Sequence, residues 1–286
     1  MTLLTEADRA DIAQCCGAAV LHERPLGHGN TTRLTTLTLA DGTILVAKTG
    51  QTGARLDIEG AMLAHLHRHG WPVPEPVLVR DDLVVMTHMP GGGGLTASAQ
   101  THAAEILAPL HAVRQESYGF PTDTLIGPLP QPNPPADDWV AFFRDHRLLH
   151  MARAAHAAGD LDRGLMGRID RLAERLDDLI GPPAAPSLIH GDLWGGNVMA
   201  EGGRIAGFID PAIYHADAEI ELAFTTLFGT FGEPFFRRYD EIRPIRPGFF
   251  ELRRDLYNLY PLLVHVRLFG GGYVGQVDRI VRHITG

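Results

Sequence analysis

The chain has 286 residues, 45% of them hydrophobic, and a formal net charge of −9. This length and apolar content are enough for one large domain or for two lobes. The acidic balance, without any run of Lys or Arg, argues against nucleic acid or an anionic membrane surface as the main partner, and no apolar stretch approaches the roughly 20 residues that span a bilayer. The first nine residues lack the apolar core of a signal peptide. Cys15 and Cys16 are adjacent and poorly placed to cross-link the fold, which favours a reduced, cytoplasmic setting.

The first ninety residues are predicted to be rich in strands. Thr35 to Leu39 alternates polar and apolar side chains, Asp41-Gly42 is a hairpin turn signal, and Ile44 to Lys48 forms the returning strand. A second pair of short apolar strands is predicted at Val77–Val79 and Leu83–Met86. Between the two pairs, apolar residues recur at helical spacing from Ile58 to Leu66, and this predicts a helix that ends at Gly70.

Beyond residue 89, helical periodicity dominates. Pro90-Gly-Gly-Gly-Gly94 is a flexible joint, and two apolar helix faces follow, over residues 139–149 and 161–179, with a Pro-rich loop from Pro128 to Pro135 before them. The sequence therefore predicts an α+β, bilobal chain. Its small β-rich lobe is expected over residues 1–89 and its larger helical lobe over residues 90–286. A cleft between two such lobes is a natural place for a nucleotide.

The stretch from Leu188 to Asn197 carries the strongest chemical signal. A hydrophobic run ends in His190-Gly191-Asp192, Asn197 follows five residues after the Asp, and a further apolar run leads to Asp210. A turn rich in Gly and Asp explains any two of these residues but not this spacing. Phosphoryl transfer from ATP uses such a set: Asp192 would orient the attacking hydroxyl and accept its proton, while Asn197 and Asp210 would hold Mg²⁺. The pattern predicts a small-molecule kinase.

Lys48 stands at the end of an apolar strand, on one face with Val46. A Lys at a strand end commonly reaches out to solvent. Eleven residues further on, however, Glu59 lies in the first turns of the predicted helix, well placed to pair with it. In a kinase the Lys holds the α- and β-phosphates and the Glu fixes the Lys. Together with the downstream motif, this predicts that Lys48 and Glu59 belong to the catalytic set.

Two further motifs each allow two interpretations. The glycines of Gly27-His28-Gly29 could bring backbone N–H groups close to phosphate oxygens, and a plain turn explains this short motif equally well. Glu219 and Glu221, just beyond Asp210, are either a solvated helix face or include a residue that binds the backbone of the catalytic loop.

The run from His190 to Asn197, with its Trp-Gly-Gly, resembles the catalytic loop of the fructosamine/ketosamine kinases, a family within the protein-kinase-like aminoglycoside phosphotransferase group. The resemblance extends from about Gly27 to Tyr273 and includes further segments typical of the family: Glu59 with Leu63 and Leu66, Leu110-His111, Asp138-Trp139 with Phe142, Phe143 and Arg147, Asp210 to Tyr214, Glu219 to Ala223, and Phe228 to Phe231.

This resemblance implies ATP-dependent phosphorylation of a sugar hydroxyl, O3, on ketosamines such as fructosamine or ribulosamine, either small or protein-bound. The product is unstable, so the family acts in deglycation. The resemblance also implies that Met86, Thr87 and Met89 line the adenine site, where backbone groups do most of the recognition. Trp194 is either a wall for the sugar or a residue that packs the catalytic loop.

Two other functions stay open. One is a small-molecule kinase of the same fold that acts on an aminoglycoside, choline or another alcohol, although the Trp-Gly-Gly run favours a ketosamine. The other is a non-catalytic nucleotide-binding module. The intact set of Lys48, Glu59, Asp192, Asn197 and Asp210 argues against that second function, because a chain without activity would be expected to have lost one of them. Nothing in the sequence specifies an oligomeric state.

Overall fold

A computed structural model describes residues 4–28, 32–183 and 185–286 of the chain. The chain forms two compact units. The first consists of Met1–Gly94 and Val198–Pro211, and the second of Leu95–Asn197 and Ala212–Gly286. The division at residues 89/90 that we expected from the sequence stays a prediction. Among the described residues, no helix combines the length and the apolar character needed to cross a membrane.

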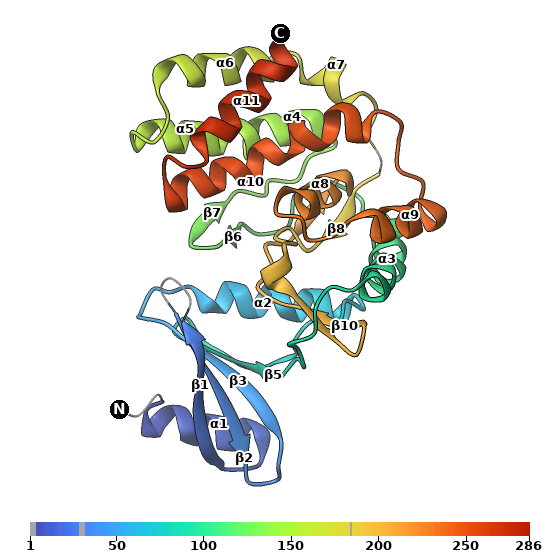
Figure 1. Ribbon diagram of the computed structural model, residues 1–286. Helices are drawn as coiled ribbons and strands as arrows, with labels where there is room; N and C mark the ends of the chain where they lie inside the picture. Colours follow the sequence, from blue (N-terminus) through green and yellow to red (C-terminus); the bar gives the residue numbers. More distant parts are fainter. Residues whose placement is uncertain (1–3, 29–31, 184) are drawn as a thin grey trace. The chain divides into compact units, whose positions relative to one another are not determined.

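The first unit is built on a five-stranded antiparallel sheet in the order β1-β2-β3-β5-β4 (Figure 1). The strand pairs and the helix predicted before residue 90 are present, with ends that differ by one or two residues. The elements of this part are β1 (Val20–His28), β2 (Arg33–Leu39), β3 (Ile44–Thr49), β4 (Pro76–Val79), β5 (Leu83–Thr87), α1 (Glu6–Cys16) and α2 (Leu56–Arg68).

Alternation along β3 decides what each face of the sheet holds. Leu45 and Ala47 pack with Leu37, Leu83 and Ile12 of α1 in a hydrophobic core. Successive side chains of a strand point to opposite faces, so Lys48 lies on the other side of the sheet from this core. Helix α2 supplies the side chain that meets it there.

The segment 198–211 joins the first unit as a hairpin of β9 (Val198–Glu201) and β10 (Arg204–Phe208). The Phe208 N–H donates to the carbonyl oxygen of Pro72 at 2.8 Å, and the Gly93 N–H donates to that of Ala200 at 2.9 Å. The Phe208 ring also meets the edge of Trp71, with the ring centroids 6.0 Å apart. Asp210, two residues beyond β10, is therefore carried by the same unit as Lys48.

The second unit is mainly helical, and α10 is its central helix, packed against α5, α8 and α11, while α3 packs against α9 (Figure 1). Its α-helices are α3 (Ala97–Ala112), α4 (Trp139–Phe143), α5 (Leu149–Ala157), α6 (Arg163–Ala173), α7 (Leu176–Ile180), α8 (Glu219–Leu227), α9 (Glu233–Ile242), α10 (Arg254–Phe269) and α11 (Val274–Thr285). Two π-helical segments, η1 (Arg144–Leu148) and η3 (Phe249–Arg253), and a 3-10 helix, η2 (Gly195–Asn197), also belong to this unit. Two small hairpins pair β6 (Thr124–Ile126) with β7 (Leu129–Gln131) and β8 (Ser187–Ile189) with β11 (Tyr214–Ala216).

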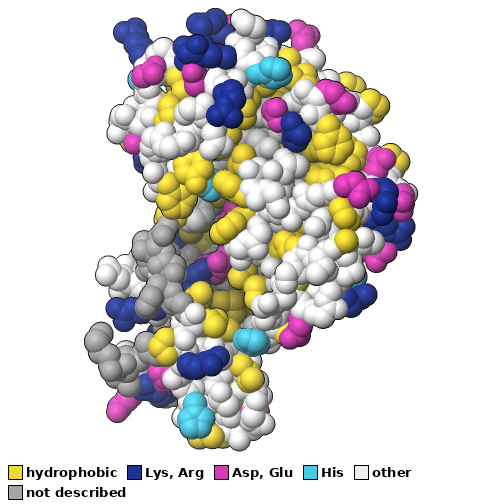
Figure 2. All heavy atoms as spheres, viewed as in Figure 1, with side chains coloured by type: hydrophobic (Ala, Val, Ile, Leu, Met, Phe, Trp, Pro, Cys, Tyr) yellow, Lys and Arg dark blue, Asp and Glu magenta, His cyan; other side chains and the backbone are white. Residues whose placement is uncertain are grey.

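The surface of α9 carries charges of both signs. Arg237 pairs with Glu233 at 3.3 Å, and Arg238 pairs with Glu241 at 2.9 Å. Acidic and basic side chains accordingly lie interspersed over this helix (Figure 2). Exposed ion pairs of this kind add little to stability, so α9 is held by the face that it buries against α3, with Phe235 and Tyr239.

Two predictions for the second unit need correction. The helical face over residues 161–179 belongs to two helices, α6 and α7, because the chain leaves helical geometry between Ala173 and Leu176. The Pro-rich segment 128–135 is not entirely loop, since it contains β7. Pro130 is tolerated in β7 because a two-stranded hairpin leaves one edge of each strand without a partner strand, where no N–H is required.

Candidate active site

Lys48 is the centre of a group of three charged side chains in the first unit. Its Nζ lies 2.8 Å from the Glu59 carboxylate and 3.0 Å from Oδ1 of Asp210. The side chains of Lys48 and Glu59 are only 11% and 13% exposed, whereas that of Asp210 is 46% exposed. The sequence predicted the pairing of Lys48 with Glu59, and the structure brings Asp210 to the same ammonium.

Burial and the neighbouring charges shift the pKa values of this group in opposite directions. Burial alone would lower the pKa of Lys48, but the carboxylates of Glu59 and Asp210 outweigh it and hold that pKa above its usual value. Burial raises the pKa of Glu59, and the nearby Asp210 adds to this effect while Lys48 opposes it. The ammonium is therefore firmly charged and has a negative partner on each side. Asp210 itself has a φ of +52°, a left-handed conformation that Asp adopts more readily than most residues.

The catalytic loop predicted from the sequence belongs to the second unit. It follows β8, and it is held by Asn197, whose Nδ2 donates to the main-chain oxygen of Asp192 at 2.8 Å and to its Oδ2 at 2.9 Å. Asp192 is partly exposed, whereas His190 is fully buried and accepts a long hydrogen bond from the Asp192 N–H at 3.4 Å. This agrees with a structural role for His190 and leaves Asp192 as the accessible carboxylate.

Gly191 is required at the bend of this loop for two reasons. Its φ of +83° is left-handed, and a Cβ at this position would overlap the carbonyl oxygen of Ala212. Its N–H donates to Oε2 of Glu221 at 2.7 Å. Of the two interpretations that the sequence left open, the solvated helix face is wrong, and Glu221 binds the backbone of the catalytic loop.

Glu221 is the inner end of a buried hydrogen-bond chain that the sequence did not predict. Nε2 of His111 lies 2.9 Å from Oε1 of Glu221, and its Nδ1 lies 2.9 Å from the hydroxyl of Tyr239, which accepts from Arg243 at 3.1 Å. Burial would raise the pKa of Glu221, but the bond to His111 and the Gly191 N–H help to hold it below its usual value. The ionised Glu221 carboxylate thus accepts from His111 Nε2–H.

We expect Glu221→Gln to lower the free energy of unfolding by about 1–3 kcal/mol, because the amide presents one oxygen and one N–H₂ to two donors, His111 and Gly191. Since the folded pKa of Glu221 is lowered, its charge stabilises the wild type above the usual value of 4.5, and this contribution is lost as the pH falls through the folded pKa. Urea unfolding of both proteins at pH 7 and in acid measures the effect. A stability difference that stays constant down to acid pH would contradict it, and Glu251→Gln, at an exposed position, is the control.

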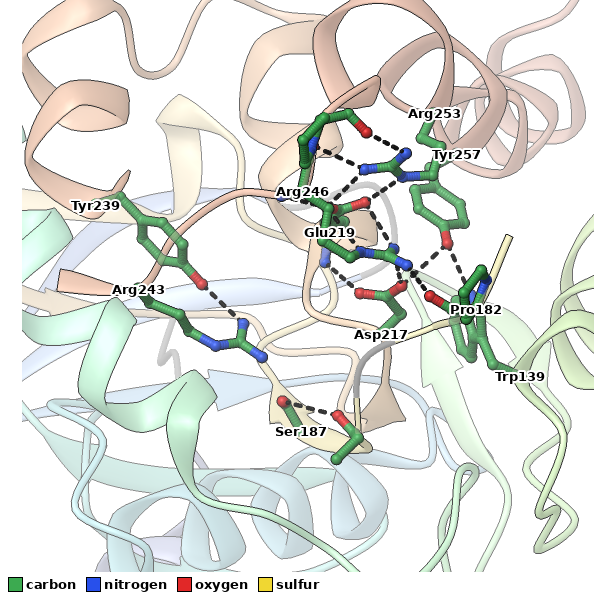
Figure 3. Close-up of polar contacts among 12 residues, drawn as sticks. Trp139, Pro182, Ser187, Asp217, Glu219, Tyr239, Arg243, Arg246, Arg253 and Tyr257 are labelled. Carbon is green, nitrogen blue, oxygen red and sulfur yellow. Dashed lines mark hydrogen bonds and ion pairs between the residues drawn. The ribbon is translucent and has the colours of Figure 1, made fainter. Parts of the chain in front are cut away.

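The start of α8 carries a second charged cluster, around Glu219 (Figure 3). Glu219 lies between Arg253 and Arg246, with contacts of 2.6 and 2.9 Å, and Arg246 also reaches Asp217 at 2.5 Å. Burial would raise the pKa of Glu219, but the two guanidinium groups outweigh it and keep that pKa low. Burial dominates at Asp217 and raises its pKa, with Arg246 opposing it only in part. Glu219 is thus a structural anchor of α8.

Trp194 is 42% exposed, and its indole folds over Gly196 so closely that a Cβ on Gly196 would overlap the ring. The glycine of the Trp-Gly-Gly run therefore sets the position of the indole. The indole also makes an edge-to-face contact with the ring of Phe228, with 6.4 Å between the centroids. Part of the indole is therefore accessible to solvent, and its contact with a sugar stays a prediction.

The residues expected at the adenine site lie in and after β5. Met86 is buried, and Thr87 pairs with Glu75 through its N–H and through its Oγ1, each at 2.9 Å. Met89 is half-buried. Gly27 lies near the end of β1, opposite Leu34, whereas Gly29 lies outside the described residues. Their contact with a nucleotide stays a prediction.

The fold is that of the protein-kinase-like phosphotransferases. A structure from Thermobifida fusca, given as a fructosamine-3-kinase, aligns with a TM-score of 0.88 and 32% identity and covers 98% of each chain. The macrolide 2′-phosphotransferase MphH from Brachybacterium faecium shares the fold at a TM-score of 0.64 and 18% identity, over 95% of each chain.

Sequence comparison shows to which family of protein-kinase-like phosphotransferases the chain belongs. The family model for fructosamine kinases matches residues 59–285. A Synechocystis protein named as a ketoamine kinase is 40% identical over 181 residues, which cover 62% of this chain and 59% of that relative. The chain belongs to the fructosamine kinase family, and the resemblance drawn from the catalytic loop is confirmed.

Proposed function

We propose that this protein is an ATP-dependent kinase that phosphorylates a sugar hydroxyl, O3, of a ketosamine. The observation that supports this most is the Lys48 ammonium, buried between Glu59 and Asp210. A buried cation with two carboxylates is costly in a purely structural role, whereas phosphate binding gives it a purpose. Lys48 lies outside the segment that the family model matches, so its role rests on this geometry.

The substrate class comes from the family and from the name of the Synechocystis relative, a ketoamine kinase. Because the matching segment spans 59% of that protein, its activity is transferred to this chain as a proposal. A ketosamine carries a sugar hydroxyl as acceptor and an amine that is a cation when protonated, which suits an acidic protein.

We assign the acceptor hydroxyl to residues of the second unit and the nucleotide to residues of the first. Asp192 orients the sugar hydroxyl and accepts its proton, while Asn197 fixes the Asp192 carboxylate. Lys48, fixed by Glu59, binds the phosphates of ATP. Gly27 and Gly29 are proposed to approach these phosphates, and Met86, Thr87 and Met89 to line the adenine.

The donor set fits a magnesium ion. An amide oxygen from Asn197 and a carboxylate from Asp210 are the hard oxygen ligands that Mg²⁺ prefers, together with phosphate oxygens and water. When bound, Mg²⁺-ATP supplies the phosphoryl group and neutralises charge on it. The partial exposure of Asp210 leaves its carboxylate accessible for this role.

The test is ATP-dependent phosphate incorporation into fructosyl-lysine, ribulosyl-lysine, an aminoglycoside and choline, with Asp192→Asn as the control. Phosphorylation of a ketosamine alone, lost in the variant, is the expected result. If only another alcohol reacts, the substrate class is wrong while the kinase chemistry holds. If no compound reacts but ATP binds, the protein is a nucleotide-binding module and the proposal fails.

A further inference from the structure

A continuous group of rings extends from the catalytic loop across the second unit. Trp194 contacts Phe228 at 6.4 Å between centroids, Phe228 contacts His265 at 4.8 Å, and His265 contacts Phe269 at 5.4 Å and Tyr273 at 5.0 Å. We call these five residues the aromatic platform. It begins two residues from Asp192 and combines the catalytic loop, the end of α8 and the end of α10.

Three of the rings in the platform are exposed to solvent. Trp194, Phe228 and Phe269 are 42%, 39% and 55% exposed. Single exposed apolar residues are ordinary, but contiguous ones mark a binding surface. None of the five side chains carries a fixed charge, so the faces of the rings are available for apolar chains and for cations.

His265 gives the platform one defined polar atom. Its Nδ1 lies 2.7 Å from the carbonyl oxygen of Pro261, so Nδ1 carries the proton and donates. Burial lowers the pKa of His265, and the ring is neutral at pH 7. Nε2 therefore carries a lone pair, and within the described parts of the chain no hydrogen bond to it is made. It can accept from an ammonium or a hydroxyl group.

We propose that the aromatic platform binds the amine-side part of a ketosamine, namely its ammonium and the apolar chain beyond it. The inference rests on the proposed function, which puts the sugar hydroxyl at Asp192. Trp194 is the platform residue nearest to Asp192 in the sequence, and the rings of Phe228, His265 and Phe269 follow it at centroid separations of 6.4, 4.8 and 5.4 Å. A protonated amine is attracted to the negative faces of the rings and can donate a hydrogen bond to Nε2 of His265. An apolar chain can bury its surface against Phe228 and Phe269.

Two ketosamines with the same sugar test this: 1-deoxy-1-methylaminofructose and 1-deoxy-1-hexylaminofructose. The wild type is expected to prefer the hexyl compound by about tenfold or more in kcat/KM, mainly through KM. Phe269→Ala and Phe228→Ala reduce this preference to near one. Phe250→Ala, an equally exposed aromatic position in η3 at 43%, leaves it unchanged and is the matched control. His265→Leu raises KM for both compounds, and His265→Gln, which retains an acceptor, restores it.

Calorimetric binding of both compounds to Asp192→Asn separates the platform from the proposed function. If neither compound is phosphorylated but the hexyl compound binds more tightly and loses this advantage in Phe269→Ala, the kinase proposal fails and the platform stands. If both compounds bind equally, or if Phe250→Ala has the same effect as Phe269→Ala, the platform assignment is wrong, whatever the turnover.

Discussion

Replacing Asp192 by Asn is expected to lower turnover by a factor of about 10²–10⁴ and to leave ATP binding close to that of the wild type. Asn has the shape of Asp but cannot accept the proton of the sugar hydroxyl. Its side-chain oxygen can still accept from Nδ2 of Asn197, as Asp192 Oδ2 does at 2.9 Å, so the loop keeps its conformation. Steady-state phosphate transfer and titration with a non-hydrolysable ATP analogue measure the two quantities.

The matched control is Asp137→Asn, at an exposed position of the same unit, which should change neither quantity. Near-normal turnover in Asp192→Asn would show that another group orients and deprotonates the acceptor. Loss of ATP binding together with turnover would show that Asp192 contributes to the nucleotide site instead.

The second large effect is expected for Lys48→Met. Loss of the ammonium removes a charge that stabilises the transferred phosphoryl group, at a cost of roughly 10²–10³ in turnover. It also leaves Glu59 and Asp210 without the cation between them, and breaking a buried pair in this way costs about 3–5 kcal/mol of stability. Kinetics and urea unfolding measure these losses separately.

The stability loss in Lys48→Met should depend on pH with a definite sign. The folded pKa of Glu59 is already raised by burial and rises further without Lys48, so the folded state binds more protons than the unfolded state. The variant therefore loses stability as the pH rises from about the usual value of 4.5 through the folded pKa. The double variant Lys48→Met/Glu59→Gln should lack this dependence and remain inactive. A double variant with restored turnover would contradict the role of Lys48.

The parts of the fold that the sequence predicted are those with strong local signals. The alternation of polar and apolar side chains, with the Asp41-Gly42 turn, predicted β2 and β3. The spacing of His190, Asp192 and Asn197 predicted the catalytic loop. Helix α1 was not predicted, because it buries only Asp8 and Ile12 and has no apolar stripe. Its one local signal is the capping box at its start, in which Thr5 and Asp8 bond each other's backbone N–H groups.

The hydrogen-bond chain behind the catalytic loop could not be predicted for a different reason. In sequence, His111 lies more than a hundred residues from both Glu221 and Tyr239. Each residue is ordinary within the sequence of its own helix. Only the tertiary structure, which packs α3 against α9 and brings Glu221 of α8 to His111, makes them partners. The same holds for Asp210, because the spacing predicted a metal ligand but not its contact with Lys48.

The hairpin of β9 and β10 has a consequence for the order in which the protein is made. The unit that holds Lys48 is discontinuous in sequence, since it needs residues 198–211 to cover Trp71 and to supply Asp210. A ribosome must therefore synthesise residues 95–197, which belong to the second unit, before the first unit can be completed. Until then Trp71 lacks the Phe208 ring that packs against it in the complete unit, and incompletely folded chains with exposed apolar side chains are prone to aggregate. The second unit is discontinuous as well, and it cannot be completed before the chain returns to it at residue 212, after the hairpin of β9 and β10.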